Sequence, residues 1–337
     1  MTEPTFDAEV APAPVLGSLP DPSRPELSIV IPLFNEEENL PELARRLGAL
    51  IESVDYPTEV VFVNDGSSDR TMELLRAQIE CQPAFRVIDF SRNFGHQAAM
   101  YAGLKRAAGR AVVLMDGDLQ DPPEIVPQLV ERWREGYEVV HAIRRKRKEG
   151  ILKRMAYAVY YRLLKTAAYI PVTVDSGDFS LMDRRVVDLI RSMPERNKFL
   201  RGLRSWVGFR QTELEYERDA RYAGTPKYTV SKLFRLALDG MVSYSFVPLR
   251  ISYAFGFIVA GGSFILGFGY LFARIFGNRP IPQGFTTLAI LILFLGGIQL
   301  LAVGMLGEYI GRIYDEVKRR PEYVERELLG FPPPPEK

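Results

Sequence analysis

The sequence predicts an α/β protein with a mostly parallel sheet, helices on both faces of that sheet, and two membrane-spanning helices near the C-terminus. Two observations lead to this prediction. Apolar runs rich in Val and Ile alternate with helical patterns between Leu27 and about Lys148, and two long uncharged runs follow later in the chain. Strands separated by helices in this way are typical of parallel sheets, which bind ligands beyond the carboxyl ends of their strands.

The alternating region contains five expected strands and four expected helices. The helices are expected at about 37–53 and from about residues 69, 95 and 123 onward. The strands are expected at LSIVIPL (27–33), EVVFV (59–63), FRVIDF (85–90), RAVVLM (110–115) and YEVVHAI (137–143).

The two uncharged runs, 251–272 and 285–306, are each long enough to cross about 30 Å of hydrocarbon as a helix. The alternative is a pair of buried core helices. The segment after the second run, RIYDEVKRR, is rich in basic residues, so the positive-inside rule places it in the cytoplasm. Two spans bring the N-terminal part to the same side. We therefore expect an integral membrane protein with both termini and the bulk of the chain in the cytoplasm.

The same patterns suggest boundaries for the parts of the chain. Residues 1–25 are rich in Pro and Ala and read as a disordered tail. A cytoplasmic domain is expected at 26–230, a two-helix membrane region at 249–310, and a cytoplasmic C-terminal tail at 311–337. Residues 151–169 and 231–248 alternate basic with apolar residues at helical spacing, which favours helices lying in the membrane interface. A packed soluble helix pair is the alternative.

Composition excludes little. Lys and Arg number 43 against 42 Asp and Glu, so no strong positive charge supports a nucleic-acid partner, and none is expected. Cys81 is the only cysteine, which excludes an internal disulfide and a cysteine-based zinc cluster. We expect it to be a small buried residue.

Polar residues follow each of the first four expected strands, and the fold would place them along one edge of the sheet. Helix caps and ordinary polar loops are the alternative reading. These residues are Pro32, Asn35 and Glu36 after the first strand, Asn64, Asp65 and Gly66 after the second, Arg92 and Asn93 after the third, and Asp116, Asp118 and Gln120 after the fourth.

The run MDGDLQDPPE carries the most chemistry. Asp116 and Asp118 leave a buried strand with one residue between them, so they can share a divalent ion while the ion keeps positions for phosphate oxygens. Mg²⁺ or Mn²⁺ is implied, offsetting charge on a departing diphosphate. Turn or capping residues are the alternative. In VNDGSSDRT, Asp65 is expected to accept hydrogen bonds from a base or ribose, while Asp69 or Ser68 caps the next helix.

These motifs together resemble a known family. VIPLFNEEENL, VNDGSSDRT, RNFGHQAAMYAGL and MDGDLQDPPE, in this order, are similar to those of family-two glycosyltransferases with the inverting GT-A fold. SGDFSLMDRRVV, RGLRSWVGFRQ, KYTVSKLFRLALDG and the two apolar runs narrow the resemblance to polyprenyl-phosphate glycosyltransferases. The chain looks most like bacterial undecaprenyl-phosphate glucosyltransferases and is related to dolichol-phosphate mannose synthases. This resemblance implies a protein of the bacterial plasma membrane whose catalytic domain lies in the cytoplasm. The resemblance covers about Leu27 to Arg320.

The resemblance implies roles for particular residues. Asp116, Asp118 and Gln120 would hold the metal and diphosphate, and Asp178 in SGDF would lie near the reacting sugar. Many relatives have two Asp where this chain has Asn64 and Asp65, so the role of the first position is open. Counting the strand-end residues above, the expected nucleotide-sugar ligands are Pro32, Asn35, Glu36, Asn64, Asp65, Arg92, Asn93, Asp116, Gly117 and Asp118.

The acceptor side is marked by the basic run RRKRK at 144–148. It reads either as a solvated loop attracted to anionic lipids or as a clamp for a lipid phosphate. The resemblance favours Arg144 and Arg147 as that clamp. Arg201 and Lys227 would also pair with phosphates, or else are surface charges.

The expected reaction is metal-dependent transfer of a hexose from a nucleotide-sugar to polyprenyl phosphate, for modification of a cell-envelope glycan. A phosphate monoester is mostly dianionic at pH 7, so no strong base is needed, and Asp178 would orient the reactants and steady positive charge at the anomeric carbon. A single displacement would invert that carbon. UDP-glucose leads by resemblance. GDP-mannose as donor and a non-catalytic nucleotide-sugar-binding scaffold are the alternatives, and homo-oligomerisation through the Gly-containing spans is expected.

Overall fold

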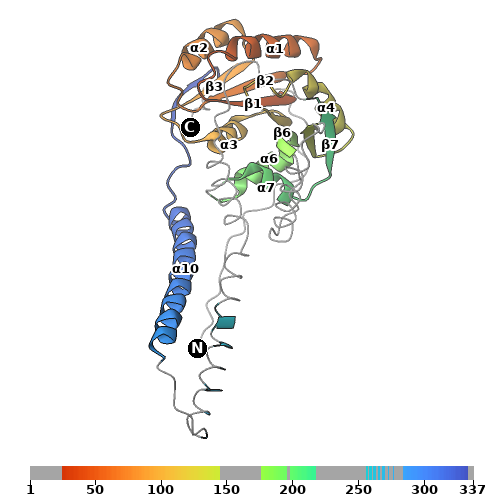
Figure 1. The fold of residues 1–337 in the computed structure, drawn as a ribbon. Helices are drawn as coiled ribbons and strands as arrows, with labels where there is room; N and C mark the ends of the chain where they lie inside the picture. The colour runs from red at the N-terminus through yellow and green to blue at the C-terminus, as the bar shows by residue number, and fades with distance from the viewer. Residues whose placement is uncertain are drawn as a thin grey trace, which may run out of the picture.

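The structure is a computed structural model that describes residues 25–144, 176–195, 198–217 and 284–332, with isolated positions between 256 and 276. Within these ranges the chain forms one eight-stranded sheet in the order β7-β5-β6-β4-β1-β2-β3-β8. A long apolar helix extends away from the sheet and its covering helices (Figure 1). The site lies in the sheet domain.

Four parallel strands form the centre of the sheet and confirm the prediction of a mostly parallel α/β fold. Val, Ile, Leu and Phe side chains of these strands are almost entirely buried, since helices cover both faces of the sheet. The strands are β1 (Leu27–Leu33), β2 (Thr58–Asn64), β3 (Phe85–Phe90) and β4 (Ala111–Leu114).

Helices cover both faces of the sheet, as predicted, and create two apolar cores. On one face pack α1 (Leu40–Ser53), α2 (Thr71–Cys81) and α4 (Val126–Arg134), the last following the short 3-10 helix η1 (Pro123–Ile125). On the other face pack α3 (His96–Arg106), α6 (Arg184–Ser192) and α7 (Leu200–Trp206). Cys81, expected to be buried, is exposed at the end of α2.

The other half of the sheet differs from a simple parallel continuation. It contains β5 (Val139–Arg144), β6 (Ser176–Asp183) and β7 (Gln211–Tyr216). β6 lies between β4 and β5 and is antiparallel to both, whereas β7 is parallel to β5. The sheet is therefore mixed at this end, and β6 brings a distant part of the chain beside the loop that follows β4.

The C-terminal part contains one long helix and an additional strand. α10 (Phe285–Val317) begins where the second span was expected and continues past Leu306. Its stretch Phe294–Val317 is long and apolar enough to cross a membrane, and is the one described helix that meets this test. The chain then returns to the sheet as β8 (Glu325–Leu329), antiparallel to β3. Residues 311–337, expected as a tail, thus include the end of α10 and an edge strand, because β3 offers an unpaired edge.

Several predictions fall outside the described residues. They are the tail at 1–24, the basic residues 145–148 with Arg147, the interfacial helices at 151–169 and 231–248, Lys227, and most of the first span at 251–272. The second of the two predicted membrane spans thus corresponds to a described helix, and the first remains a prediction.

Candidate functional site

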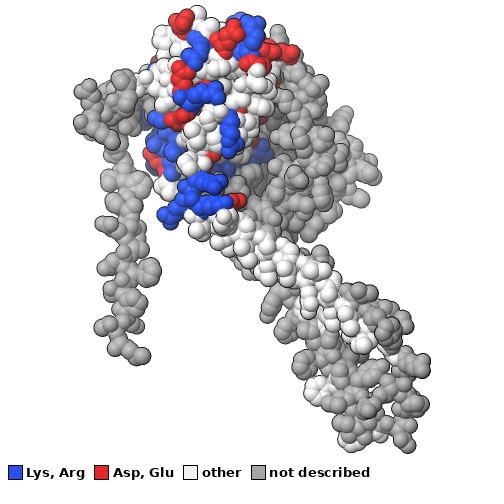
Figure 2. Space-filling model, turned by 90° about the vertical axis from the view of Figure 1, so that its left-hand side faces the viewer, with Lys and Arg blue, Asp and Glu red and all other residues white. Residues whose placement is uncertain are grey.

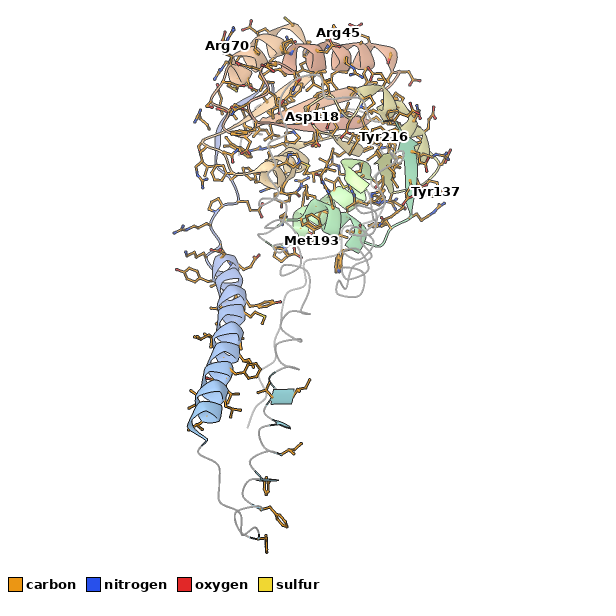
Figure 3. The ribbon with its side chains drawn as sticks, viewed as in Figure 1. Arg45, Arg70, Asp118, Tyr137, Met193 and Tyr216 are labelled. Carbon is orange, nitrogen blue, oxygen red and sulfur yellow. The ribbon has the colours of Figure 1, made fainter. Side chains whose placement is uncertain are left out.

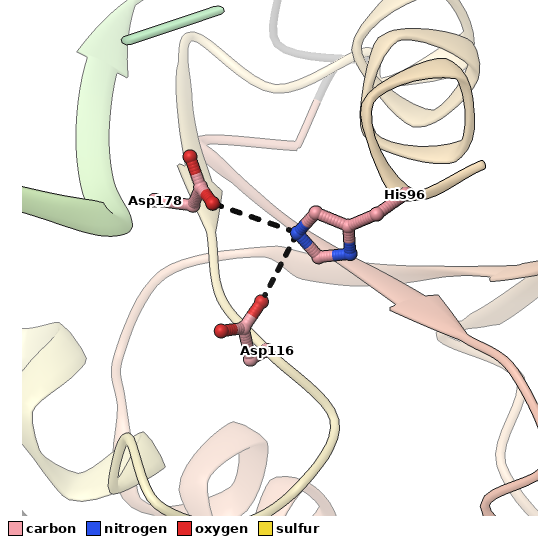
Figure 4. Close-up of side chains that lie close together, drawn as sticks. All are labelled: His96, Asp116 and Asp178. Atoms are coloured by element: carbon pink, nitrogen blue, oxygen red, sulfur yellow. Dashed lines mark ion pairs between the residues drawn. The ribbon is translucent and has the colours of Figure 1, made fainter. Parts of the chain in front are cut away.

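The sheet brings two acidic side chains together across neighbouring strands. Leu114 at the end of β4 is paired with Ser180 of β6, so the antiparallel register carries Asp116 toward Asp178. His96, at the start of α3, completes the group. Its Nε2 lies 3.4 Å from Asp116 Oδ1 and 3.5 Å from Asp178 Oδ2 (Figure 4). Three separate elements therefore converge on one small volume at the carboxyl end of β4.

The charges in this group depend on burial and on one another. Burial, helped by the nearby carboxylates and opposed by His96, raises the pKa of Asp116 from 3.8 to about 6. Burial alone would lower the pKa of His96, but Asp178 and Asp116 outweigh burial and raise it above 6.5. Near neutral pH the group thus combines an ionised acid pair with an imidazole that readily accepts a proton.

Asp178 is fixed by two arginines of α7. Arg201 donates two hydrogen bonds to its carboxylate, from Nε to Oδ1 and from Nη2 to Oδ2, both at 2.7 Å. Burial would raise the pKa of Asp178, but these bonds and His96 hold it well below its usual range. Arg204, fully buried one helical turn further, donates to the carbonyl oxygens of Asp178 and Gly177 at 3.3 and 3.1 Å. Asp178 is therefore an oriented, ionised carboxylate.

The loop after β4 forms a tight turn beside the end of β1. Asp118 Oδ1 accepts a hydrogen bond from the backbone N–H of Gln120 at 3.2 Å, and Leu119 between them has a positive φ of 59°. A Cβ on Gly117 would displace the end of the Leu33 side chain, so the loop packs closely against β1 at this point. Asp118 is partly exposed and does not belong to the group around His96, although it lies in the same loop as Asp116. Figure 3 labels Asp118 inside the sheet domain.

Asp65, at the end of β2, holds the loop that follows β3. Its Oδ1 accepts a hydrogen bond from the N–H of Phe94 at 2.6 Å, and its Oδ2 accepts from the N–H of Gly95 at 3.0 Å and from Asn93 Nδ2 at 2.9 Å. Burial raises the pKa of Asp65 although these N–H groups oppose the rise. Its neighbour Asn64 donates from Nδ2 to Asp89 Oδ1 at 2.7 Å. Both residues are almost completely buried.

The loop after β1 is tied to the loop after β2. Asn35 has a positive φ of 54°, and its Oδ1 accepts a hydrogen bond from the N–H of Ser68 at 2.8 Å. The backbone N–H of Glu36 donates to Thr71 Oγ1 at 3.0 Å. Pro32 is buried within β1. The residues expected to bind a nucleotide thus also hold the loops after β1 and β2 together, and their ligand roles remain predictions.

A divalent cation fits the acidic group. His96, Asp116 and Asp178 each offer a ligand atom, and these atoms lie within 4.8 Å of one another. Asp116 Oδ1 is buried and accepts no hydrogen bond from the described residues. A set of carboxylate oxygens with an imidazole nitrogen suits Mn²⁺ better than Mg²⁺, since imidazole favours transition metals. The set differs from the predicted ligands Asp116, Asp118 and Gln120 by including His96 and Asp178.

Arg92, Arg144 and Arg201 were also predicted as site residues. Arg92 is exposed and its guanidinium lies over the ring of Phe94, 4.0 Å from the centroid. Arg144 is the last residue of β5. Arg201, expected to bind a lipid phosphate, is paired with Asp178. Arg204 is a further residue of this group that was not predicted, although the RGLRSW pattern places it on the same helix face as Arg201.

Known proteins are similar to this chain in sequence. The family model described as glycosyl transferase family 2 matches residues 28–191. An uncharacterized glycosyltransferase, YkcC of Bacillus subtilis, is 45% identical over 91% of this chain and 95% of its own length. The SfII prophage-derived bactoprenol glucosyl transferase of Shigella flexneri is 43% identical over 89% of this chain and 97% of its own, and a prophage bactoprenol glucosyl transferase homolog of Escherichia coli K12 is 43% identical over 89% and 98%. This chain belongs to glycosyl transferase family 2.

Proposed function

We propose that this protein transfers a hexose from a nucleotide-sugar to the phosphate of a polyprenyl lipid. The donor that we favour is UDP-glucose, and the acceptor is undecaprenyl phosphate. The observation that carries the proposal is the convergence of Asp116, Asp178 and His96 at the carboxyl end of β4, with Arg201 holding Asp178 ionised. Family membership supports sugar transfer, and similarity to bactoprenol glucosyl transferases over nearly the whole chain supports this acceptor and this sugar.

In this proposal Asp178 acts as a positioned negative charge. Its carboxylate accepts two hydrogen bonds from Arg201 and is held in one orientation by the buried frame of β6 and α7. It would orient the sugar or the attacking phosphate and stabilise positive charge at the anomeric carbon. Because a phosphate monoester is already largely dianionic at pH 7, the protein needs no strong base to activate it.

The donor would lie over the loops that follow β1, β2, β3 and β4. Asp116 would hold Mg²⁺ or Mn²⁺ together with Asp118 and Gln120, or with His96 from α3. When bound, such an ion supplies positive charge that offsets the charge of the departing nucleoside diphosphate. The phosphate oxygen would approach the sugar from the opposite side. The anomeric carbon is therefore inverted, giving a β-linked lipid product from an α-linked donor.

The acceptor arrives from a membrane, which the exposed apolar surface of α10 suits. Leu300 is 74% exposed, and side chains on α10 project away from the helix (Figure 3). We propose two spans with the sheet domain and both termini in the cytoplasm, and association of copies through the spans. Arg144, Arg147 and Lys227 would bind the lipid phosphate, with Arg201 contributing where its guanidinium is not engaged by Asp178.

The test uses purified full-length protein with undecaprenyl phosphate, Mg²⁺ or Mn²⁺, and a panel of radiolabelled UDP-glucose, UDP-galactose, UDP-N-acetylglucosamine and GDP-mannose. Label extractable with the lipid from UDP-glucose is the expected result, and the linkage should be β by nuclear magnetic resonance. Transfer only from GDP-mannose would support the mannosyl alternative. Donor binding without transfer to any polyprenyl phosphate, together with unchanged biological function of Asp118→Asn, would leave a nucleotide-sugar-binding scaffold.

A further inference from the structure

The segment that follows α10 folds back onto the sheet domain at the end of β3. We call residues 322–331 the C-terminal strap. Tyr323 stacks on Phe90 of β3, with ring centroids 5.0 Å apart and planes inclined by 15°. The carbonyl of Val324 accepts a hydrogen bond from the N–H of Ser91 at 3.0 Å. The strap therefore contacts the carboxyl end of β3, where the loop that donates hydrogen bonds to Asp65 begins.

Arg326 interrupts the pairing of β8 with β3. Asp89 is opposite Glu327 and Phe90 is opposite Glu325, so Arg326 is an extra residue without a partner on β3. This is a β-bulge, a feature that redirects a side chain and is frequent beside functional sites. The redirected guanidinium donates from Nη2 to the carbonyl of Ser91 at 2.8 Å, and its Nη1 lies 3.4 Å from Asp89 Oδ2.

Asp89 connects Arg326 to the loop after β2. Its side chain is 3% exposed, so the carboxylate needs partners to offset the cost of burial. Arg326 provides one, and Asn64 Nδ2 provides the other at 2.7 Å from Oδ1. Asn64 Oδ1 in turn accepts the N–H of Ser67 at 3.3 Å. A carboxylate in place of Asn64 would face Asp89 without a proton to donate, which explains why an amide suits this position.

Ser91 connects the strap to the loop after β3. Both its N–H and its carbonyl are hydrogen-bonded to the strap, and the loop that it starts donates three hydrogen bonds to the Asp65 carboxylate before α3 begins at His96. Gly66 packs against the peptide between Arg92 and Asn93 so closely that a Cβ would collide with it. The loops after β2 and β3 therefore contact each other closely, and the strap is connected to both of them through Asp89 and Ser91.

We propose that Arg326 is a positioning residue for the nucleotide part of the donor, acting through Asp89 on residues 64–67 and through Ser91 on residues 91–95. The assignment rests on the proposed function, because these loops are where the nucleotide would bind. It also links the segment directly after the apolar helix α10 to the donor crevice. Arg326 itself touches no reacting group.

The experiment compares Arg326→Gln with Arg76→Gln in the full-length protein. Arg76 pairs with Glu327 on the same strand and is similarly exposed, but it contacts neither Asp89 nor Ser91, so it controls for loss of an ion pair on β8. We expect R326Q to raise the KM for UDP-glucose about fivefold, equivalent to about 1 kcal/mol, with kcat and the KM for undecaprenyl phosphate nearly unchanged. R76Q should leave all three values at those of the wild type.

Two further variants test whether Arg326 acts through its contacts with Asp89 and Ser91. Arg326→Lys keeps the charge but cannot contact Ser91 and Asp89 through two separate nitrogens. Its KM for UDP-glucose should therefore lie between that of the wild type and that of R326Q. Asp89→Asn combined with R326Q should raise the KM no more than the stronger single change, because both changes interrupt the same contact. An unchanged donor KM in R326Q, or an equal rise in R76Q, would overturn the proposal.

Amide hydrogen exchange of the ligand-free protein separates this inference from the proposed function. R326Q should speed exchange in peptides that cover residues 91–95, while R76Q should not. This readout holds even if the wild type transfers no sugar to a polyprenyl phosphate. Unchanged exchange at residues 91–95 in R326Q would defeat the positioning role, whatever the reaction proves to be.

Discussion

At the scale of single residues, two neighbouring acids differ in how readily they lose a proton. Burial raises the pKa of Asp116 to about 6, whereas the hydrogen bonds from Arg201 outweigh burial at Asp178 and lower its pKa. The difference arises because Arg201 compensates the charge of Asp178 while Asp116 Oδ1 accepts no hydrogen bond from the described residues. Such a pair suits a site where one acid receives a cation and the other remains ionised throughout.

Replacing Asp178 with Asn should lower kcat by about 100-fold or more, because the positioned charge is lost while the shape is kept. The KM for the nucleotide-sugar should change little, since Asp178 is expected to act near the sugar and not at the nucleotide. Single-turnover measurements with labelled donor check the chemical step. Asp188→Asn on α6, where the half-exposed carboxylate pairs with Arg184 and Arg191, is the control and should retain full activity.

Asp116 predicts a pH dependence of stability in metal-free protein. Its folded pKa is raised above the unfolded value, so the folded state binds more protons and loses stability as the pH rises from about 4 through about 6. The rise from 3.8 to about 6 corresponds to at most about 3 kcal/mol. Asp116→Asn should remove this loss. Thermal unfolding of both proteins in EDTA between pH 4.5 and 7.5 measures the difference.

The comparison needs a second arm with Mn²⁺. The ion should raise the unfolding temperature of the wild type at pH 7 and have little effect on the Asp116→Asn variant, because binding to the folded state stabilises it. Equal pH profiles for the two proteins in EDTA would contradict the account of Asp116.

At the scale of elements, the loops that follow β2 and β3 support one another. The loop after β2 approaches the loop after β3 at Gly66, whose φ is 64° and whose position leaves no room for a Cβ. Asp65 joins the same two loops, because its carboxylate accepts hydrogen bonds from the N–H groups of Phe94 and Gly95. The carboxyl ends of β2 and β3 therefore present one rigid surface, which is the condition for binding a nucleotide without a large ordering cost.

Gly66→Ala should lower stability by about 1–3 kcal/mol and weaken donor binding, because the added methyl group displaces the Arg92–Asn93 peptide and a positive φ is strained in alanine. Chemical denaturation and the KM for UDP-glucose measure the two effects.

Gly48→Ala is the matched control. Gly48 lies in the middle of α1 with no atom near the position of a Cβ, so the change should raise stability by about 0.5–1 kcal/mol. Similar losses in both variants would mean that the close approach at Gly66 has no particular importance.

At the scale of the whole molecule, an apolar helix and a catalytic domain are joined by a short basic connection. α10 ends at Val317, and Lys318, Arg319 and Arg320 follow before the strap reaches β3. Figure 2 shows Lys and Arg side chains gathered where the domain meets the white apolar helix. Basic residues at the end of an apolar helix favour the cytoplasmic surface of a membrane. The arrangement suits an enzyme whose acceptor is anchored in lipid.

Leu300→Arg should reduce membrane insertion, since Arg near the centre of a spanning helix costs about 2.5–3.5 kcal/mol. The fraction of protein that stays with membranes after carbonate washing measures insertion. Val317→Arg is the control, because Val317 is similarly exposed but is the last residue of α10, beside the basic residues 318–320, where an added Arg can reach the membrane surface. Equal retention of L300R and the wild type would contradict the assignment of α10 as a span.

Much of the central fold follows from local patterns. The alternation of Val-rich and Ile-rich runs with helical segments was sufficient to predict β1 to β4 and the helices between them, and α10 begins at the predicted Phe285. Each of these elements buries its own apolar residues at a regular spacing, so a short stretch of sequence carries the information. The same logic identified Asp116 as the acid that leaves a buried strand.

Only the tertiary structure decided which distant residues meet. β6 inserts antiparallel beside β4 and brings Asp178 toward Asp116, and β8 brings Arg326 beside the loops that follow β2 and β3. No local spacing encodes these pairings, because the partners are far apart in the chain and their contact depends on which strand edges remain free once the helices have packed. The sequence by itself therefore determined the elements and the kinds of chemical groups at their ends, whereas long-range packing decided how those groups were combined into a site.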